Sequence, residues 1–212
     1  MSEPVTLYQL RLSSNNIKIR IALNYKGIPF ERVDVDPQDR SEVVKVSGQP
    51  LTPVLVHGDR VMFDSASILR YIDANFPDQP RLFTSDYDGM KTIEKWETWA
   101  RTELVQAFYI VMGQFRSPVG ERNAAESKRA ADMLHDMTGK IEAQLEKTPW
   151  LAGDTMTAAD ITAAPLVNPA VITPEQAGDD PRLKFYTENI RLGEGRERTH
   201  EWVKKVMAYD RS

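Results

Sequence analysis

The chain has 212 residues, 41% of them hydrophobic and 27% charged, and its net charge of −4 comes from acidic and basic residues mixed along the whole length. This composition is typical of a compact globular protein of one or two domains, and it offers no basic face for nucleic acid or for a membrane surface. The absence of cysteine excludes disulfides, thiol nucleophiles and thiolate metal sites. No run approaches the roughly 20 apolar residues of a membrane-spanning helix. The N-terminal "MSEPVTLYQL" lacks a signal pattern, so we expect a cytoplasmic protein.

The first third of the chain alternates between strand and helix patterns. The strand pattern "VTLYQL" precedes the helical pattern "NIKIRIALNYKG", and a second pair follows in "PFERVDVD" and the short polar "PQDRSEVVKVSG". Two apolar runs around a turn in "TPVLVHGDRVMFD" predict a hairpin, and "SASILRYIDANF" places apolar residues on one helical face. The order βαβαββα predicts a compact α/β domain over residues 1–80.

Beyond the turn-rich segment "FPDQPRLFTSD" only helical patterns occur. The longest is the amphipathic "GMKTIEKWETWARTELVQAFYIVMGQF", which we expect to form one long helix. Three more helices are expected from "AAESKRAADMLHDMTGKIEAQLEK", "TAADITAAPLV" and "RTHEWVKKVMAYD". The sequence therefore predicts an all-helical domain over residues 88–212.

Thr157 and Asp160 have the spacing of a capping box, in which each side chain accepts a hydrogen bond from the other residue's backbone N–H. Met156 and Ile161 flank the box at the spacing of a hydrophobic staple. We interpret Asp160 as a structural helix cap, whose loss should cost about 0.5–2 kcal/mol.

Pro53 stands directly before the apolar run "VLV", although a proline cannot donate to a β-ladder. The "LTP" that contains it, the βαβαββα order, the "DS" at the start of the next helix and "WLAGDTMTAADI" together resemble the cytosolic glutathione transferase family over nearly the whole chain. The resemblance implies a thioredoxin-like N-terminal domain and an all-α C-terminal domain. It also implies a cis Thr52–Pro53 bond, with the backbone N–H and C=O of Thr52 pairing with glutathione as an added strand would. A trans proline in an edge turn is the alternative.

Asp64 and Ser65 follow "TP" at the distance typical of glutathione transferases. The resemblance implies that this pair binds the γ-glutamyl group. The carboxylate meets its ammonium, and the serine hydroxyl with free amides at a helix start meets its carboxylate. In isolation, "DS" is an ordinary helix N-cap.

The reaction centre is expected in "RLSSNNIKIRIAL", where the first strand gives way to the first helix and thioredoxin-like enzymes carry a redox cysteine. The turn resembles the Ser-Ser-Cys turn of zeta-class transferases, and Ser13 falls on the position of the activating serine or catalytic cysteine. Asn15 falls where some bacterial and fungal members, including the nu class, place an asparagine near the glutathione sulfur, so it could assist or replace Ser13. Helix capping is the alternative for both residues.

The chemistry requires a modest electrostatic effect. A free thiol has a pKa of about 8.5, so keeping glutathione mostly ionised at neutral pH requires a shift of about two units, or roughly 2.7 kcal/mol. A hydroxyl hydrogen bond and the positive end of a helix can supply this together. The electrophile is expected beside Leu12, Tyr109, Met112 and Phe115, although an aromatic and methionine stripe at helical spacing is also the pattern of a core.

The chain departs from the family pattern near Pro53. Theta- and delta-like members often carry a histidine, and zeta members a glutamine, at places that here are Pro50 and Leu51. The candidates that remain for the glycyl carboxylate of glutathione are Gln49, Arg40 and Lys45. The zeta cysteine is replaced by Asn15, so maleylacetoacetate isomerisation is not implied. The three histidines match no metal-ligand spacing, and we expect no metal.

The leading interpretation is a glutathione transferase that conjugates glutathione, its cosubstrate, to small hydrophobic electrophiles or reduces them, with a role in detoxification. A glutathione-dependent peroxidase, and a noncatalytic transferase-fold module that binds ligands or proteins, are the alternatives. A thiol transferase is disfavoured because no cysteine can form the mixed disulfide. The resemblance also implies a homodimer that buries segments matching Ser65–Phe76 and Met90–Phe115.

Overall fold

The structure is a computed structural model that describes residues 3–211. The chain divides into two compact units, one made of residues 3–85 together with 208–211 and the other of Asp86–Met207. The division differs from the expected one at the end of the chain, where residues 208–211 belong to the first unit. We call residues 208–211 the return segment.

The first unit has the expected βαβαββα order. Its elements are β1 (Val5–Gln9), α1 (Ser14–Tyr25), β2 (Glu31–Asp34), α2 (Ser41–Ser47), β3 (Val54–His57), β4 (Arg60–Phe63) and α3 (Ser65–Asn75). The sheet order is β2-β1-β3-β4, with β1 parallel to β2 and antiparallel to β3, and β4 antiparallel to β3. This mixed sheet confirms the predicted thioredoxin-like domain.

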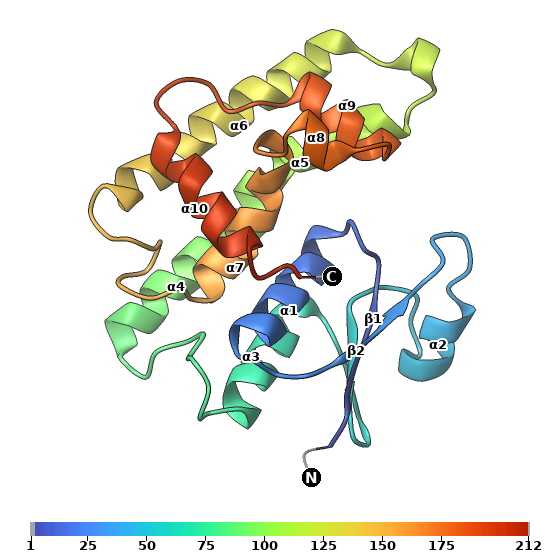
Figure 1. The fold of residues 1–212 in the computed structure, drawn as a ribbon, viewed down its shortest axis with the longest axis vertical. Helices are drawn as coiled ribbons and strands as arrows, with labels where there is room; N and C mark the ends of the chain where they lie inside the picture. The colour runs from blue at the N-terminus through green and yellow to red at the C-terminus, as the bar shows by residue number, and fades with distance from the viewer. Residues whose placement is uncertain (1–2, 212) are drawn as a thin grey trace. The chain divides into compact units, whose positions relative to one another are not determined.

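Two apolar layers flank the sheet, because successive side chains of a strand point to opposite faces. Leu7 pairs with Leu55 across β1 and β3, and both are fully buried. The neighbouring residues Tyr8 and Val54 point to the other face, where Val43 of α2 joins their cluster. Figure 1 shows α1 and α3 on one side of the sheet and α2 on the other. Because β1 and β4 run in the same direction, the turns that lead from them into α1 and α3 lie at the same end of the sheet.

The second unit is helical, as predicted. It contains α4 (Tyr87–Trp99), a π-helical turn (Ala100–Leu104), α5 (Val105–Arg116), a 3-10 turn (Val119–Glu121), α6 (Ala124–Leu145), α7 (Ala158–Val167), a second 3-10 turn (Asn168–Ala170), α8 (Pro174–Ala177), α9 (Pro181–Asn189) and α10 (Glu197–Met207). The long helix expected from the amphipathic pattern is present as continuous helical backbone, in which the π-helical turn joins α4 to α5. All residues of α7 are buried, and it packs against α4 and α10.

The capping box at the start of α7 is present, which confirms Asp160 as a structural cap. Its carboxylate also accepts hydrogen bonds from the backbone N–H of Leu151 and the indole N–H of Trp202, at 2.9 and 2.8 Å. Burial raises the pKa of Asp160, while these hydrogen bonds and those of Thr157 oppose the shift. One side chain thus joins α7, α10 and the loop between α6 and α7.

Among residues 3–211, no helix combines the length and apolar character needed to cross a bilayer.

Candidate active site

The turn between β1 and α1 leaves the Ser13 hydroxyl available. Ser13 is the N-cap residue of α1, yet its side chain makes no capping hydrogen bond. The backbone N–H and C=O of Ser13 are both hydrogen-bonded. The N–H donates to the Leu10 carbonyl at 3.0 Å, and the carbonyl accepts from the amides of Asn16 and Ile17, each at 2.9 Å. The capping alternative for the Ser13 side chain therefore does not hold, and a half-buried hydroxyl lies at the positive end of a helix.

Asn15 connects this turn to the "DS" pair. The Ser65 hydroxyl donates to Asn15 Oδ1 at 3.3 Å, although the two residues are 50 positions apart in the chain. Asn15 itself is exposed, whereas Ser65 is buried at the first position of α3. The structure therefore brings together two segments that the sequence predicted as parts of one site.

Asn16 makes the second connection, and sequence reasoning missed it. Its side chain is fully buried, and Nδ2 donates to Thr52 Oγ1 at 3.1 Å. Its Oδ1 is also buried and has no hydrogen-bond partner among the described residues. A polar residue next to the apolar Ile17 at a helix start looks like one more capping candidate, so the sequence carried no signal for this role.

The Thr52–Pro53 peptide bond is cis, as predicted. Pro53 is buried and lies one residue before β3, so it does not occupy a position in the ladder. Within residues 3–211, the backbone N–H and C=O of Thr52 have no hydrogen-bond partner. Both groups are therefore available to an extended peptide.

Asp64 lies at the start of α3 with a φ of 70°, in the left-handed region that non-glycine residues rarely adopt. Its Oδ1 accepts from the Ser67 amide at 2.8 Å, so it also serves as the N-cap of α3. Burial acts to raise the pKa of Asp64, but hydrogen bonds from Ser67 and Ala66 and the charge of Lys18 outweigh it and lower the pKa. Asp64 is therefore a carboxylate at neutral pH.

The three candidates for binding the glycyl carboxylate of glutathione differ in whether their side chains are already hydrogen-bonded within the protein. The Gln49 amide donates to Ser47 and to the Leu51 carbonyl and accepts from the Leu51 amide, which occupies it in holding the loop before Pro53. Arg40 precedes α2, and its Nη1 is buried without a hydrogen-bond partner among the described residues. Lys45 is exposed on α2.

The residues proposed for the electrophile fall into two groups. Met112 is 8% exposed, and its sulfur accepts from the Tyr186 hydroxyl at 3.4 Å. Phe115 packs on Phe185 with ring centroids 5.7 Å apart. These two side chains belong to the packing of the helical unit, as the core alternative anticipated. Tyr109 is 59% exposed, and Leu12 is half-buried in the turn before α1.

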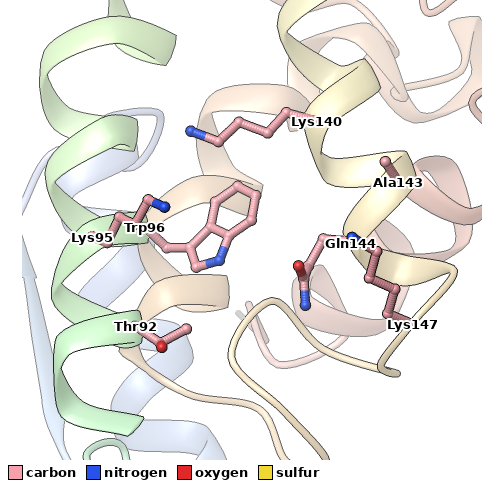
Figure 2. A pocket seen from close by; sticks show the side chains of 7 residues that line it. All are labelled: Thr92, Lys95, Trp96, Lys140, Ala143, Gln144 and Lys147. Atoms are coloured by element: carbon pink, nitrogen blue, oxygen red, sulfur yellow. The ribbon is translucent and has the colours of Figure 1, made fainter. Parts of the chain in front are cut away.

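A separate cleft of about 330 Å³ lies between α4 and α6, inside the helical unit. Figure 2 shows the indole of Trp96 in the space between the two helices, with Lys140 extending over it from α6. Lys95 and Lys147 also line this cleft, but no hydroxyl and carboxylate pair of the kind found in the first unit lies there. Residues 3–211 contain no group of three His, Cys, Asp or Glu side chains that could hold a metal ion.

Comparison with known proteins connects both units to one family. The model described as glutathione S-transferase, N-terminal domain, matches residues 7–80, and the corresponding C-terminal domain model matches residues 99–209. Glutathione S-transferase 3 of Zea mays is 29% identical over 200 residues, covering 88% of this chain and 89% of the relative. Glutathione S-transferase F10 of Arabidopsis thaliana is 30% identical over 172 residues, covering 76% and 78%.

Solved structures agree at the level of the fold. The theta-class glutathione S-transferase of Xanthomonas axonopodis pv. citri, solved with glutathione bound, superposes with a TM-score of 0.70 at 21% identity, covering 92% of this chain and 96% of that one.

Proposed function

The chain belongs to the glutathione S-transferase family, and we propose that its first unit binds glutathione with the thiol beside Ser13. It is a glutathione transferase with glutathione as cosubstrate. The observation that carries the proposed site is the convergence of three segments through two side-chain hydrogen bonds, Ser65 to Asn15 and Asn16 to Thr52.

Each segment offers groups that match one part of glutathione. The unpaired backbone N–H and C=O of Thr52 suit the cysteinyl peptide group, as in strand addition. The Asp64 carboxylate suits the γ-glutamyl ammonium, and the first amides of α3 suit the γ-glutamyl carboxylate, joined by the Ser65 hydroxyl when it turns from Asn15 to the ligand. Arg40, with its unpaired guanidinium nitrogen, is our candidate for the glycyl carboxylate.

The Ser13 hydroxyl and the start of α1 then lower the pKa of the bound thiol. A hydrogen bond from a hydroxyl favours the thiolate over the thiol, and the helix dipole adds to the effect. The thiolate attacks the electrophilic atom of the second substrate, forming the S–C bond, and the electrophile either expels a leaving group or takes up a proton. Leu12 and the exposed Tyr109 are our candidates for contact with that substrate.

The test is the thiolate absorbance of the glutathione complex as a function of pH. Ser13→Ala should raise the pKa of the bound thiol and lower kcat/KM, while glutathione affinity stays nearly unchanged because the peptide contacts remain. If Asn15 activates the sulfur instead, Asn15→Ala should give this result and Ser13→Ala a mild one. An identical thiol pKa in wild type and both variants would refute both assignments. A protein that binds glutathione but is inert towards a panel of electrophiles would favour the noncatalytic alternative.

Two further properties are proposed from the family. A two-fold homodimer is consistent with the edge strand β4, where Val61 and Phe63 are 41% and 51% exposed. A monomer mass at micromolar concentration in light scattering would contradict it. A cytoplasmic location stays a prediction from the sequence.

A further inference from the structure

Arg20 carries a buried guanidinium in the first unit, and its side chain donates four hydrogen bonds. It lies on α1, and its side chain is 5% exposed. Nε and Nη2 donate to the two carboxylate oxygens of Asp210, at 2.6 and 2.9 Å. Nη1 donates to Gln9 Oε1 at 2.8 Å, and Nη2 also donates to the backbone carbonyl of Arg11 at 3.0 Å. Every nitrogen of the guanidinium is therefore in use.

The bonds to Gln9 and Arg11 fix the chain where it enters the turn between β1 and α1, residues 10–13, which we call the reaction turn. Gln9 is the last residue of β1, and its own Nε2 donates to Asp34 Oδ1 of β2 at 2.8 Å. Arg11 lies inside the turn that the Ser13 amide closes on the Leu10 carbonyl. Because the Arg11 carbonyl belongs to the peptide plane two residues before Ser13, its orientation sets the direction in which the chain enters the Ser13 N-cap.

The bond to Asp210 comes from the return segment, which is attached to α1 by further contacts. Asn24 Nδ2 donates to the Tyr209 carbonyl at 2.8 Å, and the Tyr25 and Tyr209 rings meet edge to face with centroids 5.2 Å apart. Asp210 itself is 17% exposed, so its carboxylate is largely withdrawn from water. A bidentate pair between carboxylate and guanidinium fixes the plane of the guanidinium as well as its position.

We propose that Asp210 is a positioning residue for the reaction turn, acting through Arg20. The paired carboxylate balances the buried guanidinium and holds it in the plane from which Nη2 reaches the Arg11 carbonyl. Without that carboxylate, an uncompensated buried charge is costly, and Arg20 moves towards water and releases the turn. The inference rests on the proposed function, because it treats the turn around Ser13 as the place where the thiol is activated.

The test combines kinetics with hydrogen exchange in the full chain. Asp210→Asn keeps the size of the side chain but removes its charge. Arg20→Lys keeps the charge but removes the planar guanidinium that binds the carboxylate through two nitrogens. Both should lower kcat about tenfold, since small misplacements of a reacting group have effects of this order or larger. Both should raise the pKa of the bound thiol by about half a unit or more. The KM for glutathione should stay within about twofold, because Thr52, Asp64 and Ser65 lie on other segments.

Two controls separate positioning from general loss of stability. Asp210→Glu retains a bidentate carboxylate and should restore most of kcat and the thiol pKa. Arg32→Gln removes a different attachment of the return segment, the 3.4 Å bond from Arg32 to the Arg211 carbonyl, and should leave both quantities unchanged. In the protein without glutathione, Asp210→Asn should speed amide exchange of residues 11–16 about tenfold over wild type.

The outcomes distinguish this inference from the function on which it rests. If wild type lowers the thiol pKa and Asp210→Asn lowers it equally, with unchanged exchange in the turn, the positioning role is wrong. The role is also wrong if Asp210→Asn loses activity only in proportion to the fraction unfolded. If the thiol of glutathione bound to wild type has the same pKa as in free glutathione, the proposed activation is wrong, and so is this inference.

Discussion

Asn16 and Thr52 are joined by one side-chain hydrogen bond, 3.1 Å from Nδ2 to Oγ1, between residues 36 positions apart. The bond ties the start of α1 to the residue before the cis peptide bond, so the two halves of the proposed glutathione site are held to each other. Thr52→Val preserves the shape of the side chain but leaves Asn16 Nδ2 buried without its acceptor. We expect the free energy of unfolding to fall by about 1–3 kcal/mol in urea denaturation.

The double variant Asn16→Ala with Thr52→Val is the control for this bond. If the two side chains act as a pair, the losses of the single variants should not add, and the coupling should be at least about 0.5 kcal/mol. Strictly additive losses would contradict a direct interaction.

Asp64→Asn should weaken glutathione binding by about 1.5–3 kcal/mol, the range for hydrogen bonds to charged groups. Asparagine is as good an N-cap as aspartate, so α3 should keep its stability and the loss should be specific to the ligand. Titration calorimetry measures it, with Asp59→Asn, an exposed carboxylate of the β3–β4 turn, as the matched control. Because the pKa of Asp64 lies below the ordinary 3.8, its contribution should be constant above about pH 5 and decline only as the pH falls through that lowered value. Equal affinity in Asp64→Asn and wild type would exclude this ammonium site.

Glu142 acts as an N-terminal cap for α10 although it lies on α6. Its carboxylate accepts from the amides of Arg198 and Thr199, at 3.0 and 2.8 Å, and from the Thr199 hydroxyl at 2.7 Å. Glu142→Gln should lower the free energy of unfolding by about 1.5–3 kcal/mol. Glu146→Gln is the control, because Glu146 makes an exposed ion pair with Arg198, 3.7 Å from Oε1 to Nη1. This substitution should cost less than about 0.5 kcal/mol.

The stabilising effect of Glu142 should depend on pH with a definite sign. Burial acts to raise its pKa, but the hydrogen bonds from Thr199 and Arg198 outweigh burial and lower the pKa. A lowered pKa in the folded state stabilises the protein above the ordinary value of 4.5, and this contribution is lost as the pH falls through the folded value. The difference between wild type and Glu142→Gln should therefore be constant near neutrality and shrink below pH 4.5. A difference that grows in acid would show that the carboxylate is not preferentially ionised in the fold.

Lys140 lies over two indole rings, with Nζ 5.1 Å from the Trp96 centroid and 4.4 Å from that of Trp99. Burial and, to a smaller extent, the charge of Lys95 lower its pKa against the opposing effect of Glu103. Tryptophan fluorescence should therefore show an alkaline transition with a midpoint below the ordinary 10.5, as the cation over the rings loses its charge. The transition should disappear in Lys140→Gln and persist in Lys147→Gln. Its persistence in Lys140→Gln would assign it to another group.

The sequence predicted the features that depend on neighbouring residues. Alternation, helical periodicity and turn residues were sufficient for the βαβαββα order, and the spacing of Thr157 and Asp160 was sufficient for the capping box. The cis bond at Pro53 was predicted through the family resemblance, because isolated proline chemistry allows either isomer.

The features that were missed depend on contacts distant in sequence. Asn16 resembles a capping residue until its partner Thr52 is known, and nothing near Asp210 in the chain indicates that it pairs with Arg20. The methionine and aromatic stripe around Met112 fits a pocket or a core equally well, because periodicity identifies a buried face without identifying what covers it. The π-helical turn within the long amphipathic stretch likewise left the overall periodicity intact.

The bond between Arg20 and Asp210 spans 190 positions, and this has a consequence for the order of events during translation. Domains form as the chain leaves the ribosome, beginning with N-terminal residues. The strands and helices of the first unit are made early, but the carboxylate that neutralises Arg20 is made only after the entire helical unit. The nascent α/β unit therefore carries a guanidinium without its counter-charge until residue 210 has left the ribosome. Only then can the unit reach its full stability.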